Sequence, residues 1–113
     1  MRRTLVVRTW FVGLALISSV GLASAQDAKK GQEVYTAQKC SMCHGIAGKG
    51  AKSNPLDGVG AKLSADEIRH WIVAPVDAAA KAKSTKKPPM PAKYAKLPAA
   101  DLDALVAYMQ SLK

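Results

Sequence analysis

The sequence predicts an all-α domain of three to five helices joined by long loops. Two segments carry apolar side chains on one helical face, namely Ile68, Trp71 and Ile72 in one and Leu102, Leu105, Val106 and Met109 in the other. No segment shows the convincing alternation of apolar and polar residues that is typical of a half-buried strand. Residues 45–60 are rich in glycine and contain Asn-Pro and Asp-Gly turn dipeptides, which predicts a loop. These features indicate helices and loops that wrap closely around a central group.

Three segments account for the expected helices. Residues 27–39 have a weak helical period and are expected to form a helix that leads into the residues after it. A capping box of Ser64 and Glu67 begins the next helix, and Pro75 is expected to end it. The clearest helix covers 99–112, with acidic residues early and a lysine at its end, as the helix dipole prefers.

The chain of 113 residues is long enough for one domain, and its first 25 residues resemble a secretory signal peptide. They combine a basic start, an apolar stretch and the small residues Ala23-Ser24-Ala25. We therefore expect a signal in 1–25, a mature domain in 26–113 without a membrane span, and a periplasmic location. The alternative is an uncleaved membrane anchor.

The stretch Cys40-Ser41-Met42-Cys43-His44 contains both cysteines of the chain. Two thiols three residues apart point the same way on one helical turn, and the histidine follows at once. This spacing is the attachment signature of a c-type haem. Cys40 and Cys43 would form thioethers with the haem vinyl groups, and His44 would be the proximal iron ligand, so the predicted cofactor is one covalent haem c with its iron.

Three other interpretations of this motif are weaker. A thiol–disulfide oxidoreductase carries such cysteines near a strand in a βαβ unit, and no β-branched strand run flanks the motif. A structural zinc needs four ligands, and only His70 remains to complete the set. A simple disulfide, which an exported protein could form, would leave His44 unexplained.

Met90 is the candidate for the second axial ligand. It lies within Pro88-Pro89-Met90-Pro91, where the prolines hold the chain extended, as suits a ligand on a stiff loop. Thioether sulfur is a known haem-iron ligand, and together with histidine it raises the reduction potential. Met109 lies on an apolar helix face and is expected in the core, whereas Met42 is too near His44 to reach the opposite face of a haem.

Taken together, these residues resemble a class I monohaem cytochrome c over nearly the whole mature chain. The order of the features carries the resemblance: attachment motif early, methionine far downstream, helix last. Gly31 and Tyr35 resemble the glycine and aromatic residue of the family's first helix. Leu105 and Tyr108 resemble the leucine and aromatic residue of its last helix. In the family these two helices cross closely.

The resemblance implies two further site residues. Pro55 would present its backbone carbonyl to the His44 N–H, which would fix the imidazole tautomer. Trp71 would donate its indole N–H to a haem propionate, with plain core packing as the alternative. Two departures from the family pattern are that Tyr35 stands five residues before Cys40, where four is commoner, and that Pro98 replaces a Ser or Thr cap.

With both axial positions filled, the expected function is one-electron transfer by a soluble, monomeric carrier between exported or membrane-bound redox partners, and not catalysis. The alternatives are a small subunit of a larger oxidoreductase, or a haem enzyme or gas sensor in which Met90 dissociates. Such an enzyme needs a distal group, and His70, expected to be exposed, is poorly placed for that role. Residues 26–113 carry a formal net charge of +6, from 14 Lys and Arg and 8 Asp and Glu, and Lys81, Lys83, Lys86 and Lys87 before Met90 favour acidic docking partners. No nucleic-acid motif accompanies the charge.

Overall fold

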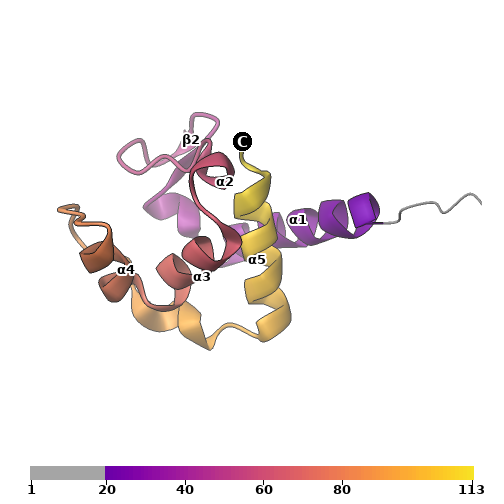
Figure 1. Cartoon of the computed structure of the whole chain (residues 1–113). Coiled ribbons are helices and arrows are strands. Elements are labelled where there is room, and N and C mark those ends of the chain that lie inside the picture. The colour runs from indigo at the N-terminus through magenta and orange to yellow at the C-terminus, as the bar shows by residue number, and fades with distance from the viewer. Residues whose placement is uncertain (1–19) are drawn as a thin grey trace, which may run out of the picture.

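The two longest helices of the protein cross and form its frame. They are α1 (Val20–Ala37) and α5 (Ala99–Ser111), and Figure 1 shows the smaller elements gathered on one side of α5. The structure is a computed structural model that describes residues 20–113. Most of the predicted signal segment lies outside these residues, and α1 begins within its last part.

A glycine allows α1 and α5 to approach closely. A Cβ atom added to Gly31 would lie 2.6 Å from Cβ of Tyr108, and closer still to the backbone oxygen of Ala104. Beside this crossing the rings of Tyr35 and Tyr108 meet edge to face, with centroids 5.8 Å apart. The close crossing that the sequence resemblance implied is therefore present.

The predicted loop of residues 45–60 contains more structure than expected. After the 3₁₀ turn η1 (Cys40–Met42), strands β1 (Gly45–Ile46) and β2 (Lys49–Gly50) pair antiparallel. The turn between them uses Ala47 and Gly48, both with positive φ, which suits a tight hairpin. Each strand has only two residues, too few for an alternating pattern to appear in the sequence. The short helix α2 (Val59–Lys62) follows.

Helix α3 (Ala65–Val73) confirms the predicted capping box and the predicted end. Ser64 accepts a hydrogen bond from the Glu67 backbone, and the Glu67 carboxylate accepts one from the Ser64 N–H at 2.7 Å. Helix α4 (Pro75–Lys81) was not expected, because Pro75 was interpreted only as the end of a helix. Proline also suits the first turn of a new helix, since its missing N–H would have no partner there.

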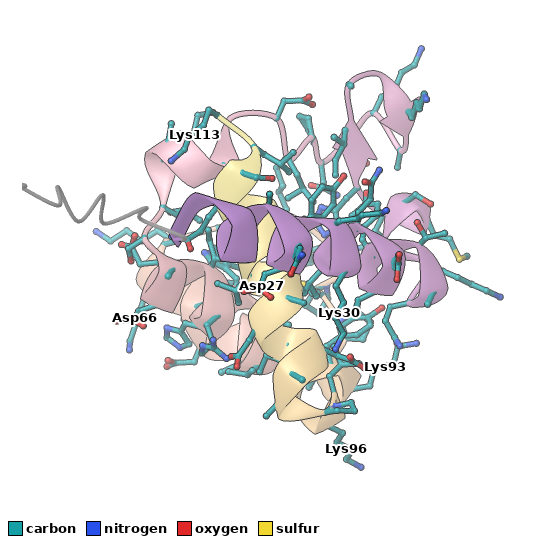
Figure 2. The ribbon with its side chains drawn as sticks, turned by 90° about the vertical axis from the view of Figure 1, so that its right-hand side faces the viewer. Asp27, Lys30, Asp66, Lys93, Lys96 and Lys113 are labelled. Carbon is teal, nitrogen blue, oxygen red and sulfur yellow. The ribbon has the colours of Figure 1, made fainter. Side chains whose placement is uncertain are left out.

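The chain closes with η2 (Ala92–Lys96) and α5, whose predicted extent is confirmed to within a residue. Pro98 stands at the N-cap of α5 and provides no side-chain cap. In Figure 2, Lys93 and Lys96 project from the segment before α5, and Lys113 lies beyond its other end. The core joins residues of α1, α3, η2 and α5, namely Val34, Tyr35, Ile68, Ile72, Tyr94, Leu102, Leu105, Val106 and Met109. The all-α class is therefore confirmed, apart from the small β-hairpin.

Within residues 20–113, no helix has both the length and the apolar character that a membrane crossing requires.

Candidate functional site

An apolar cavity lies where α1, α2, α3 and α5 meet the two loops that carry the predicted ligands. The cavity is open on one side and has a volume of about 190 Å³. Aliphatic and aromatic side chains form most of the wall. Four predicted site residues line it, namely Cys40, His44, Trp71 and Met90. The cavity thus brings together residues that are far apart in sequence.

The cysteine motif forms one wall of the cavity through a tight turn. Lys39 takes a left-handed conformation, with φ of 56°, and ends the helical path of α1 before the turn. Helix α1 itself ends at Ala37, two residues earlier. The backbone N–H of Cys43 and that of His44 both donate to the Cys40 carbonyl, at 3.1 and 3.0 Å.

The two thiols occupy different environments. Cys40 is half-buried in the cavity wall, Cys43 is exposed, and both are free. Burial raises the pKa of the Cys40 thiol, which favours its protonated form. A group bonded to both sulfurs would extend from the cavity interior to the molecular surface. Residues 20–113 contain no cluster of three or more His, Cys, Asp or Glu that could hold a metal ion.

His44 is oriented by a backbone carbonyl. Its Nδ1 lies 3.1 Å from the carbonyl oxygen of Asn54, so Nδ1 carries the proton and Nε2 keeps a free lone pair. Burial lowers the pKa of His44, which favours the neutral imidazole that binds metals. The Asn54 side chain also donates to the Cys43 carbonyl at 3.2 Å, and this ties the same residue to the cysteine turn.

The carbonyl partner of His44 differs from the one that the resemblance implied. Asn54, and not Pro55, supplies the acceptor. Gly45 and Pro55 form a parallel β-bridge. In it the Gly45 N–H donates to the Asn54 carbonyl, and the Leu56 N–H donates to the Gly45 carbonyl. Carbonyls alternate in direction along extended chain, so the Asn54 carbonyl faces His44 and the next one faces away. The acceptor carbonyl therefore belongs to Asn54, one residue before the Pro55 that the resemblance implied.

Met90 reaches the cavity from a segment that is otherwise at the surface. Residues 81–89 are all exposed, whereas Met90 is half-buried and packs against the core. Met109 also lines the cavity, but it lies on α5 within the core, as expected, with 6% of its surface exposed. Met42 is 74% exposed and takes no part. Two thioethers therefore face the cavity, and Met90 is the one on a loop.

Trp71 lines the cavity with Ile68 and Ile72, its neighbours on α3. His70 is outside the cavity wall, but it is less exposed than predicted. Its Nε2 lies 2.7 Å from a carboxylate oxygen of Asp77, which links α3 to α4. Helix α4, which brings Asp77 to His70, was not expected from the sequence.

Tyr35 contributes to the site in a way that sequence reasoning missed. It lines the cavity from α1, and its hydroxyl donates to the His44 carbonyl at 3.4 Å. Burial raises the pKa of Tyr35, which keeps the hydroxyl protonated and able to donate. The sequence signal was present, since Tyr35 follows Gly31 by one helical turn, but it indicated only a helix contact.

The basic segment before Met90, Lys81, Lys83, Lys86 and Lys87, is exposed throughout. Lys81 pairs with Asp77 one turn earlier, with Nζ 3.3 Å from the carboxylate. Lys86 instead reaches the loop after His44, where its Nζ donates to the Ser53 carbonyl at 3.0 Å. The segment therefore lies near the chain that holds the histidine as well as near Met90.

Comparison with known proteins gives one match. The model of the cytochrome c family matches residues 28–113, which covers every residue that lines the cavity. No curated protein and no solved structure matches this chain.

Proposed function

This chain belongs to the cytochrome c family, and we propose that it carries single electrons between redox proteins, with His44 and Met90 as the axial ligands of its haem iron. Proteins of this family bind haem c covalently and transfer electrons. In this chain the attachment motif is Cys40, Cys43 and His44. The bound haem supplies reversible one-electron chemistry between ferric and ferrous iron.

One observation carries the proposed ligation: His44 and Met90 line the same apolar cavity although they lie on separate segments. The bond from Nδ1 to Asn54 leaves Nε2 of His44 available to a metal. The thioether of Met90 needs no deprotonation to bind iron. When both axial positions are held by protein side chains, no position is open to a substrate, which favours electron transfer over catalysis.

The chain's own part is to exclude water and to hold its ligands in place. An apolar wall lowers the local dielectric, and a thioether ligand raises the reduction potential. The half-buried Cys40 and exposed Cys43 support a haem with one edge near the surface, where a partner could approach. A haem enzyme would need a free acid or base at the cavity, and His70, the candidate that the sequence offered, is paired with Asp77 outside it.

We propose a periplasmic carrier that docks on acidic surfaces of its partners. The signal-like residues 1–25 support export, and the basic segment supports electrostatic docking. Intact mass of the protein purified after export tests the first point. We expect one added haem and the loss of residues 1–25, and retention of those residues would indicate a membrane anchor instead.

Replacement of each cavity methionine tests the ligation. Met90→Ala should abolish the sulfur-to-ferric-iron charge-transfer band, lower the reduction potential and allow the ferrous haem to bind carbon monoxide. Met109→Leu, which replaces the other thioether of the cavity with a side chain of similar size, should do none of these. Survival of the band in Met90→Ala, or its loss in Met109→Leu, would refute the assignment.

A further inference from the structure

The segment that carries Met90 is held at only a few points. Figure 1 shows α4 and the turn beyond it standing at the edge of the molecule, away from the pair formed by α1 and α5. On the C-terminal side, η2 anchors the segment through the buried Tyr94 and its contact with α3. On the N-terminal side, the chain from 81 to 89 is exposed. On this side no packed element of the described chain holds the Met90 segment, so only individual contacts can attach it to the rest of the molecule.

Lys86 makes that contact. Its Nζ donates to the Ser53 carbonyl at 3.0 Å, across 33 residues of sequence. Among the described residues, this is the one side-chain hydrogen bond that joins segment 82–91 to segment 45–58. The backbone N–H groups of Lys83 and Ser84 bond backward, to the end of α4, and the Ser84 hydroxyl accepts a bond from the Lys86 backbone N–H at 3.4 Å.

The position of Ser53 connects the Lys86 contact to His44, the other proposed ligand. Ser53 immediately precedes Asn54, whose carbonyl orients His44 and whose side chain binds the Cys43 carbonyl. Between Lys86 and Met90 stand Lys87 and two prolines, and another proline follows, so the backbone has few free torsions here. A displacement of Lys86 is therefore transmitted to Met90 instead of being absorbed between them.

We propose that Lys86 is a positioning residue that holds the Met90 segment against the His44 segment and thereby disfavours replacement of Met90 at the iron by another ligand. The inference rests on the proposed ligation by Met90. It assigns to Lys86 a role distinct from docking, although Lys86 belongs to the basic segment. Lys87, the adjacent residue of equal charge, is exposed and makes no hydrogen bond within the described part of the chain.

The two neighbouring lysines allow a matched comparison in the haem-loaded protein. Lys86→Ala and Lys87→Ala remove the same charge, but only the first removes the contact with Ser53. We expect Lys86→Ala to raise the apparent affinity of the ferric protein for imidazole, which competes with Met90, by roughly two- to five-fold, as suits one exposed hydrogen bond. Its charge-transfer band should also fade at a lower temperature than that of Lys87→Ala. Lys86→Arg, which keeps a long cationic donor, should restore the original behaviour.

The outcomes separate this inference from the proposed function. Equal imidazole affinities for Lys86→Ala and Lys87→Ala, or failure of Lys86→Arg to restore the original value, would overturn the role of Lys86 and leave Met90 as a ligand. Absence of the charge-transfer band from the unaltered protein would refute the ligation itself. Ser53→Ala should resemble the unaltered protein, because the acceptor is a backbone carbonyl.

Discussion

Gly31→Ala should weaken the crossing of α1 and α5. The new Cβ would lie 2.6 Å from Cβ of Tyr108 and closer to the backbone oxygen of Ala104, whereas real Cβ atoms essentially never come within 3.0 Å of such neighbours. The carbonyl of Ala104 is part of a regular helix and cannot rotate away. The two helices must therefore separate or tilt.

Two opposing terms set the size of the effect. Overpacking of a close contact costs about 1–3 kcal/mol, and a clash with rigid backbone belongs at the upper end of this range. Alanine is favoured over glycine inside a helix by about 1 kcal/mol. The free energy of unfolding should therefore fall by about 2 kcal/mol, which corresponds to a loss of roughly 8–16 °C in Tm for a domain of this size.

Guanidinium unfolding of the haem-loaded protein, followed by far-ultraviolet circular dichroism, measures this change as a lower midpoint at constant slope. Gln32→Ala is the matched control, because residue 32 is the exposed neighbour of Gly31 on the same helix. It should alter stability only slightly. If Gly31→Ala were as stable as the unaltered protein or as Gln32→Ala, the close approach would not limit side-chain size at this position.

Two further perturbations address the capping box and the basic segment. Ser64→Ala should lower the free energy of unfolding by about 1 kcal/mol in the same unfolding assay. The hydrogen bond that the Ser64 backbone N–H donates lowers the pKa of the Glu67 carboxyl. The stabilisation of the folded state by Glu67 is therefore complete above the unfolded pKa of about 4.3 and is lost as pH falls through the lower folded value. That acid-side loss should be absent in Glu67→Gln, and its persistence there would contradict the assignment. Lys87→Glu should lower the rate of electron transfer to an anionic redox protein, measured by stopped flow, and should flatten the salt dependence of that rate. Lys29→Glu on α1 is the control and should have a much smaller effect. Equal slowing by the two variants would mean that only net charge matters.

Those parts of the fold that depend on local signals were predictable from the sequence. The capping box of Ser64 placed the start of α3 correctly, and the apolar stripe through Leu105 placed α5 to within a residue. Helix α4 was missed because Pro75 is compatible both with the end of one helix and with the start of the next. Which of these applies depends on packing, and here Pro75 and Ala78 are buried.

The sequence indicated side chains that the structure brings to one cavity, but not their backbone partners. Cys40, His44 and Met90 were identified from spacing and from neighbouring prolines, and the structure places all three at one cavity. The acceptor for His44 was assigned to Pro55, whereas Asn54 supplies it. Every residue carries a carbonyl, so residue identity says nothing about which one turns inward. The contact between Lys86 and Ser53 was hidden for the same reason.

The short stretch of Ser53 and Asn54 connects both proposed ligands of the iron. One carbonyl orients His44, and the adjacent one binds the side chain that precedes the Met90 segment. An electron carrier works fastest when oxidation and reduction leave its ligands in place, and a shared support resists independent movement of either ligand. Because both acceptors are backbone atoms, side-chain substitutions at residues 53 and 54 leave the two carbonyl contacts available. Loss of coordination should therefore follow from changes in backbone conformation here, or from loss of Lys86, more readily than from truncation of the Ser53 side chain.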